Sequence, residues 1–391
     1  MLSSGLEKEL QMKKIICIFV LILICFTPIS KADNEETMKE QQEEFGITDF
    51  IKSAQEYTGE FFEEMDISTI LDSALKGEVD NTSLGKRIFN LLGKEVVNGV
   101  RSILIILVIV MIHSILKSVS ESLENENIAK LIYYVQYILI ITVVMTNFSE
   151  IVTMVRDTCT NLVGFMNLLV PLLISLMLYT GSITTSGLLE PVILFMINFM
   201  GNIIQNLIIP FVLIFASLVI ISKISDKVQI HKLANFLKSG IVWFLGIVLT
   251  IFVGVVSLEG TLSSSVDGVT AKTTKAIVSS AIPVVGKILG DAVDTVLGCG
   301  IILKNAVGLV GVVIVIGICI MPVLKLAVLT IAYKLLAGVC EPIADTKIVS
   351  LLEQIGDIFR ILLAILCSIS VMLIIGTTLV IKMSNAGMMY R

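Results

Sequence analysis

Three charged residues stand at helical spacing in an otherwise apolar stretch: Lys287, Asp291 and Asp294. A helix from Ala281 to Leu303 advances about 100° per residue, so its small and charged residues gather on one face, within an arc of roughly 140°. This face comprises Gly286, Lys287, Gly290, Asp291, Asp294 and Gly298. Charge in an apolar environment is costly, and such a face therefore indicates a role in packing or function.

Several structures suit this face. It suits an amphipathic helix at the membrane surface, or ordinary helix packing through the Gly286-x-x-x-Gly290 pair. It also suits a helix that lines a water-filled path between membrane helices. The neighbouring charges are mixed in sign and fit either internal ion pairing or a polar conduit; they are Asp267, Lys272, Lys275 and Lys304.

No motif for catalysis or cofactor binding accompanies the charged face. The phosphate-binding motif G-x-x-x-x-G-K-[ST] is absent, as are H-E-x-x-H, G-x-S-x-G and G-x-G-x-x-G. Asp291 and Asp294 lie on a single helix, whereas catalytic carboxylates must leave room for a substrate between them. Seven cysteines at unrelated spacings and two histidines favour neither a disulfide framework nor a metal site. We expect no enzyme activity, no cofactor and no nucleic-acid partner.

The composition predicts a membrane protein. Hydrophobic residues make up 55% of the chain and charged residues only 16%, whereas soluble domains carry about 25% charged residues. The charges are unevenly distributed, because Asp33 to Asn98 holds six Lys and Arg against sixteen Asp and Glu. An acidic front segment therefore precedes a polytopic membrane body.

The beginning of the chain predicts a signal peptide. Met12-Lys13-Lys14 forms a charged start, Ile15 to Phe26 an apolar core, and Ser30-x-Ala32 a cleavage site. We expect a leader and signal peptide over 1–32, with Met12 as an alternative start and an uncleaved anchor as the alternative reading. An acidic, helical extracytoplasmic segment is expected over 33–98, with apolar residues such as Phe50, Ala54 and Tyr57 at helical spacing.

A polytopic, all-α membrane domain is expected over 99–391, with the charged amphipathic helix at about 281–303. About eight spans follow the signal, each of a length that suits a bilayer. They are 103–119, 131–148, 162–180, two short spans or a kinked hairpin within 191–222, 241–257, 308–331 and 361–381. The basic loop from Lys223 to Lys238 is expected in the cytoplasm by the positive-inside rule, and this places the acidic segment outside.

The sequence resembles a known family, stage III sporulation protein AE of endospore-forming bacteria. The resemblance covers nearly the whole chain, and several stretches carry it. They are Phe252-Val-Gly254, Asp267-Gly268-Val269 with Lys272 and Lys275, Ile282-Pro-Val-Val-Gly286, Asp291-Ala-Val-Asp294-Thr, Leu303-Lys-Asn-Ala-Val-Gly308, Tyr333-Lys334-Leu335 and Glu341-Pro342-Ile343.

The resemblance implies a membrane component of the channel between mother cell and forespore. The family acts after engulfment, in the mother-cell-derived outer membrane around the forespore. The implied partners are membrane lipid and the other stage III sporulation A operon proteins, including a secretion-type ATPase and ring-forming proteins, with stage II sporulation protein Q reached indirectly. The family has no established catalytic residues, so none is transferred to this chain.

The resemblance and the residues together suit a permease-like or export-platform core whose path is faced by Lys287, Asp291 and Asp294. Two alternatives stay open at the level of sequence. A self-contained secondary transporter needs paired broken helices, for which Pro210 and Pro283 are the only hints. A structural scaffold for the ring-forming partners predicts that every intramembrane charge can be changed as long as assembly survives.

Overall fold

The computed structural model describes residues 34–58, 60–62, 67–76, 81–122, 126–224, 231–281 and 285–386. Four short elements come first: α2 (Asn34–Glu44), α3 (Ile47–Gln55), the 3-10 turn η1 (Glu60–Phe62) and α4 (Ile67–Lys76). The long elements are α5 (Asn81–Ser122), α6 (Glu126–Tyr179), α7 (Ile183–Ile203), the π-helical turn η2 (Ile204–Ile208), α8 (Ile209–Ile224), α9 (His231–Ala281), α10 (Val285–Cys340) and α11 (Thr346–Ala386). Every element in these ranges is helical, which confirms the all-α prediction. The predicted signal peptide lies outside the described residues.

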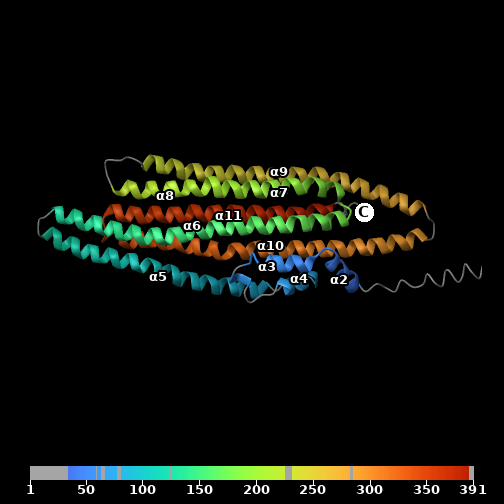
Figure 1. Ribbon diagram of the computed structural model, residues 1–391, viewed down its shortest axis with the longest axis horizontal. Coiled ribbons are helices and arrows are strands. Elements are labelled where there is room, and N and C mark those ends of the chain that lie inside the picture. The colour runs from blue at the N-terminus through green and yellow to red at the C-terminus, as the bar shows by residue number, and fades with distance from the viewer. Residues whose placement is uncertain are drawn as a thin grey trace, which may run out of the picture.

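The long helices run side by side in alternating directions and form an elongated bundle (Figure 1). Helices α10 and α11 make the most extensive contact, and α6 packs on both of them. Helices α7, α8 and α9 cover one side of this centre, whereas α5 and the short elements α2 to α4 lie on the other. The C-terminal ends of α5, α8 and α10 all lie at one end of the bundle, and the short elements lie toward the other end.

The helices are much longer than a bilayer is thick. Helix α6 has 54 residues and is therefore about 80 Å long at 1.5 Å per residue, against a hydrocarbon core of about 30 Å. Within the described residues, six helical stretches are long and apolar enough to cross a membrane. They are Ile88–Leu116, Leu131–Tyr179, Thr185–Lys223, Lys232–Leu258, Val296–Cys340 and Thr346–Lys382. The chain is a polytopic α-helical membrane protein, and its helices extend beyond any single crossing.

The number of stretches differs from the expected eight spans for two reasons. The predicted spans 131–148 and 162–180 both belong to α6, which continues without a break between them. The predicted pair of spans within 191–222 is likewise one continuous rod, formed by α7, η2 and α8. The π-helical turn η2 ends two residues before Pro210. This wider turn accommodates the proline, because in a regular α-helix the proline ring would clash with the backbone carbonyl four residues earlier.

Two other predicted boundaries fall inside helices. The charged stretch predicted at 281–303 is not separated from the predicted span 308–331, because α10 runs unbroken from Val285 to Cys340. The predicted boundary between the front segment and the membrane domain, after Asn98, lies within α5. The front segment therefore consists of a small helical cap, residues 34–76, followed by a helix that is continuous with the bundle.

Aromatic residues hold the cap on the bundle by fitting against two glycines. A Cβ atom added at Gly317 of α10 would lie 2.0 Å from Cε2 of Phe62, and one added at Gly164 of α6 would lie 2.7 Å from Cε1 of Tyr57. Only a residue without a side chain leaves this room. Phe50 and Ala54 of α3 are also buried, as their helical spacing predicts.

Candidate functional site

The charged face predicted from sequence lies on the first part of α10, whose backbone is helical from Val285. The side chains of Lys287, Asp291 and Asp294 lie outside the described residues, as do the surroundings of Gly286 and Gly290. Gly298 is half-buried, and a Cβ atom added there would meet nothing within 4 Å. The role of this face stays a prediction.

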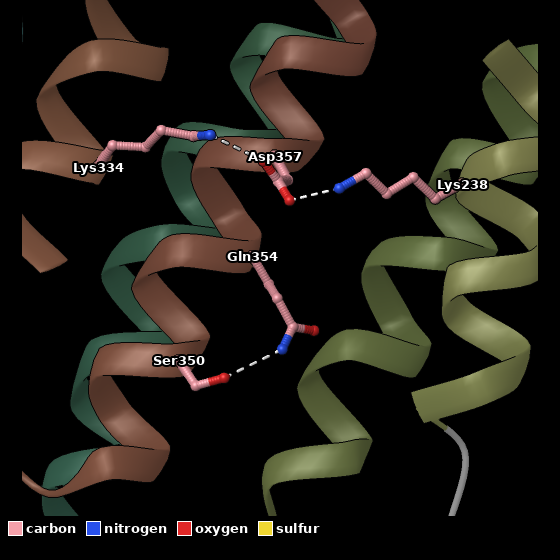
Figure 2. A network of polar contacts seen from close by, with 5 residues as sticks. All are labelled: Lys238, Lys334, Ser350, Gln354 and Asp357. Carbon is pink, nitrogen blue, oxygen red and sulfur yellow. Dashed lines mark hydrogen bonds and ion pairs between the residues drawn. The ribbon is translucent and has the colours of Figure 1, made fainter.

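A charged network lies in the described part of the bundle, centred on Asp357 of α11 (Figure 2). Its carboxylate accepts from Lys238 Nζ of α9 at 2.5 Å and from Lys334 Nζ of α10 at 3.1 Å. The Asp357 side chain is only 19% exposed, whereas the two lysines are 34% and 41% exposed. One carboxylate thus joins three helices, with each oxygen facing a different ammonium group.

Polar contacts continue along the same face of α11. Gln354 Nε2 donates to Ser350 Oγ at 3.2 Å, and Lys223 Nζ at the end of α8 donates to the same hydroxyl at 2.8 Å. Ser350, Gln354 and Asp357 are spaced by four and three residues, so a helix brings them onto one side. The network therefore connects α8, α9, α10 and α11. Because Asp357 is paired with Lys238 and Lys334, and Lys223 is bound by the Ser350 hydroxyl, the arrangement is that of a structural clamp.

A second polar feature is a hollow between α5, α6 and α10, formed by two adjoining cavities of about 270 and 210 Å³. Glu95 and Lys325 line both cavities. The larger one is also lined by Tyr57 and Phe61 of the cap and by Met154, Thr158, Asn161, Gly317, Ile318, Met321 and Pro322. The smaller one is also lined by Asn98, Gly99, Asn147, Glu150, Ile151, Val328 and Leu329. We call this feature the polar hollow.

Helical spacing explains how the polar hollow is lined. The contributing residues of α6 and of α10 recur every three or four positions, from Asn147 to Asn161 and from Gly317 to Leu329. Pro322 lies in this stretch of α10 and has no N–H to donate to the carbonyl of Ile318, one turn earlier. Such an interrupted helix is tolerated at membrane depth where the backbone is covered by protein or faces a cavity.

The charges of the polar hollow differ from those of the network around Asp357. The side chains of Lys325 and Glu150 line the same cavity, yet neither forms a hydrogen bond or an ion pair with any described residue. Lys325 is half-buried, and Glu150 is exposed at the rim. Separate charges of opposite sign in one cavity can bind a charged group that enters it.

Helices α6 and α7 are also joined by polar contacts. The carboxamides of Asn167 and Asn198 donate to each other, at 3.1 and 2.9 Å, and Gln205 of η2 donates to Thr160 at 2.9 Å. Reciprocal amide contacts of this kind stabilise the packing of membrane helices.

The sequence did not predict the polar hollow or the network as sites, although Lys223 and Lys238 belong to the predicted basic loop and Lys334 to a stretch that carries the family resemblance. Lys325 carried a signal, since it is a charge inside the predicted span 308–331. Glu150 fell in a stretch that was assigned to a connection between spans. Asp357 was placed outside the predicted span 361–381. Nothing local in the sequence indicates which of these charges face one another.

The described residues contain no group of three or more His, Cys, Asp or Glu that could hold a metal ion. Four of the five described cysteines are buried as free thiols: Cys159, Cys299, Cys319 and Cys340. The polar features of the bundle are therefore made of ammonium, carboxylate, amide and hydroxyl groups. These groups suit binding and solvation of polar solutes.

Comparison with known proteins gives the chain a family. The family model described as "Stage III sporulation protein AE" matches residues 65–384. Stage III sporulation protein AE of Bacillus subtilis (strain 168) is 30% identical over 306 residues, which cover 78% of this chain and 77% of that protein. No solved structure matches the chain. The matched region includes all of α5 to α10, the network around Asp357 and the polar hollow except for Tyr57 and Phe61 of the cap. The chain therefore belongs to the stage III sporulation protein AE family.

Proposed function

We propose that the chain is the permease-like or export-platform core of the channel complex between mother cell and forespore, and that the polar hollow is part of its path. The observation that carries this proposal is the polar hollow itself. It places an ammonium group, two carboxylates and several amides among helices that are otherwise apolar. Polar groups at such a position commonly mark pathways for solutes or ions.

The orientation follows from the distribution of basic residues. The end of α8 and the start of α9 lie at the same end of the bundle as the C-terminal ends of α5 and α10. Lys223 lies near the end of α8, Lys232 and Lys238 lie near the start of α9, and Lys347 is the second residue of α11. By the positive-inside rule this end faces the mother-cell cytoplasm. The cap then faces the space between the two membranes around the forespore, where the ring-forming partners have their extracytoplasmic domains.

The charged face of α10 extends the proposal toward the cap end of the bundle. Lys287, Asp291 and Asp294 belong to the same helix as Lys325. We propose that this face, with Gly286, Gly290 and Gly298, lines the outer part of the path. The alternative for this face is internal ion pairing or close helix packing. A triple charge-neutral substitution that leaves forespore development intact, in an abundant protein, would exclude it from the path.

The experiment tests the polar hollow with near-isosteric neutral substitutions in sporulating cells. Lys325→Gln and Glu150→Gln remove the charges of the hollow and keep side chains of similar size. Lys382→Gln and Glu353→Gln are matched controls, because both residues are exposed on α11 and neither lines the hollow. We expect the first two variants to lose late forespore gene expression, measured with a reporter, while immunoblots show wild-type abundance.

A structural scaffold is the second candidate, because Asp357 is paired with two lysines and joins three helices as a clamp. The scaffold predicts wild-type reporter expression in Lys325→Gln and Glu150→Gln, and that result would overturn the path proposal. A self-contained transporter predicts that purified protein moves a solute across a vesicle membrane without any partner. The export-platform core predicts that such movement needs the ATPase.

A further inference from the structure

We propose that the polar hollow binds a small zwitterion with an apolar side chain, namely an α-amino acid such as leucine. This inference rests on the proposed function and adds a substrate class to the same site.

The size of the polar hollow limits the ligand. The two cavities measure about 270 and 210 Å³, and each is smaller than the pockets of drug-sized molecules, which begin at about 300 Å³. A single amino acid that reaches into both cavities fits this space, whereas a folded domain does not. The ligand is therefore a small solute.

The charges of the smaller cavity specify a molecule with both signs. Lys325 of α10, Glu150 of α6 and Glu95 of α5 line it. Glu95 has an interaction of its own, whereas Lys325 and Glu150 are paired neither with each other nor with another described residue. A carboxylate next to Lys325 and an ammonium group next to Glu150 would satisfy both charges at once. Asn98 and Asn147 line the same cavity and supply amides that can donate and accept hydrogen bonds.

The larger cavity specifies the side chain of the ligand. Part of its wall is apolar, formed by Met154, Ile318, Met321 and Phe61, and the rest is polar, with Glu95, Thr158, Asn161 and Lys325. Methionine side chains adapt to ligands of different shape. An apolar side chain placed there leaves the amino and carboxylate groups at the junction of the two cavities, where Lys325 is located. The expected ligand is thus a free α-amino acid with an apolar side chain.

The test uses full-length protein in lipid nanodiscs and radiolabelled leucine at equilibrium. We expect saturable binding, with methionine as a good competitor. Leucinamide lacks the carboxylate and 4-methylpentanoate lacks the ammonium group, so we expect each to compete at least about tenfold less well, as the loss of one charged hydrogen bond implies. Wild-type protein that shows no saturable leucine binding would overturn the inference.

Two variants connect the ligand groups to their residues. Lys325→Gln should weaken leucine binding by about tenfold or more and should no longer distinguish leucine from leucinamide. Glu150→Gln should instead lose the distinction from 4-methylpentanoate. Lys382→Gln and Glu353→Gln should bind as wild type does. Unchanged affinity and selectivity in both hollow variants would contradict the assignment.

A third variant tests the apolar wall without removing a charge. Ile318→Trp fills the larger cavity, so it should weaken leucine binding more than glycine binding. An equal effect on both ligands would refute the placement of the side chain.

The leucine-binding experiment and the forespore reporter experiment can contradict the substrate class and the path independently of each other. If Lys325→Gln and Glu150→Gln abolish reporter expression but leucine does not bind, the substrate class is refuted and the path stands. If leucine binds as described but both variants support normal forespore development, the path is refuted and the binding site stands.

Discussion

Gly317→Ala is expected to loosen the cap from the bundle. The added methyl carbon would lie 2.0 Å from Cε2, 2.7 Å from Cζ of Phe62 and 3.0 Å from Cδ1 of Phe61. Optimal contact between carbon atoms is about 3.5–4.0 Å, so the Phe62 ring must retreat by about 1.5–2 Å. Both rings are buried, and they lie edge to face with centroids 5.0 Å apart. Phe62 therefore cannot move without disturbing Phe61, which lines the polar hollow.

The magnitude follows from the cost of overpacking, which is about 1–3 kcal/mol. Alanine also favours the helical state of α10 over glycine, by about 0.8–1 kcal/mol. That gain applies whether the cap is docked or not, so it does not offset the clash. The population of undocked cap should rise by about 5- to 150-fold.

Limited proteolysis at Lys52 measures this population. Lys52 is exposed but lies within α3, so trypsin needs the local opening of that helix. When opening and closing are fast, cleavage follows the population of the open state. Gly317→Ala should be cleaved at Lys52 about 5- to 150-fold faster than wild type, by the same estimate. The substitution Phe62→Leu shortens the clashing side chain, and in its background Gly317→Ala should have little further effect.

Gly338→Ala is the matched control, since it lies on the same helix and an added Cβ would meet nothing within 4 Å. It should leave cleavage at Lys52 unchanged. Equal cleavage of wild type, Gly317→Ala and Gly338→Ala would refute the argument that the aromatic fit at Gly317 holds the cap.

Two more predictions concern the contacts between helices. Asp357→Asn leaves Lys238 and Lys334 without their carboxylate, so it should lower the stability of the purified protein by about 1.5–3 kcal/mol. Glu353→Gln, one turn earlier and exposed, should melt at the same temperature as wild type. Equal melting temperatures of the two variants would contradict the clamp. Asn167→Ala and Asn198→Ala should be non-additive, with a coupling energy of about 0.6–1.7 kcal/mol in a double-mutant cycle, and strict additivity would exclude a stabilising amide pair.

The helical membrane class could be predicted from sequence because long apolar runs with few charges have no other folded form in a bilayer. The expected break between the spans 131–148 and 162–180 was wrong, because α6 continues through the polar residues between them. Arg156, Asp157 and Thr160 are exposed on one face of α6, whereas Val155 just before them and Cys159 among them are buried. Hydropathy averaged over a window cannot separate such a two-faced helix from a loop.

The polar hollow could not be predicted because its charges come from three helices. Glu95, Glu150 and Lys325 are far apart in sequence, and only the packing of α5, α6 and α10 brings them to one cavity. A charge inside an apolar stretch indicates that Lys325 matters. It does not indicate its neighbours. The buried residues of the cap could be predicted from the sequence, because Phe50 and Ala54 follow a simple helical period.

The most direct test of the path is the reactivity of a cysteine at position 325 toward a water-soluble thiol reagent, in sporulating cells and in a variant without the native cysteines. Ile331→Cys serves as the reference, because Ile331 lies on the same helix and is 60% exposed on the outer apolar surface. The path predicts that Lys325→Cys reacts and Ile331→Cys does not, and that removal of the ATPase partner changes the rate at position 325. A silent cysteine at position 325 in an abundant protein would contradict a water-filled hollow and leave the scaffold as the function of the chain.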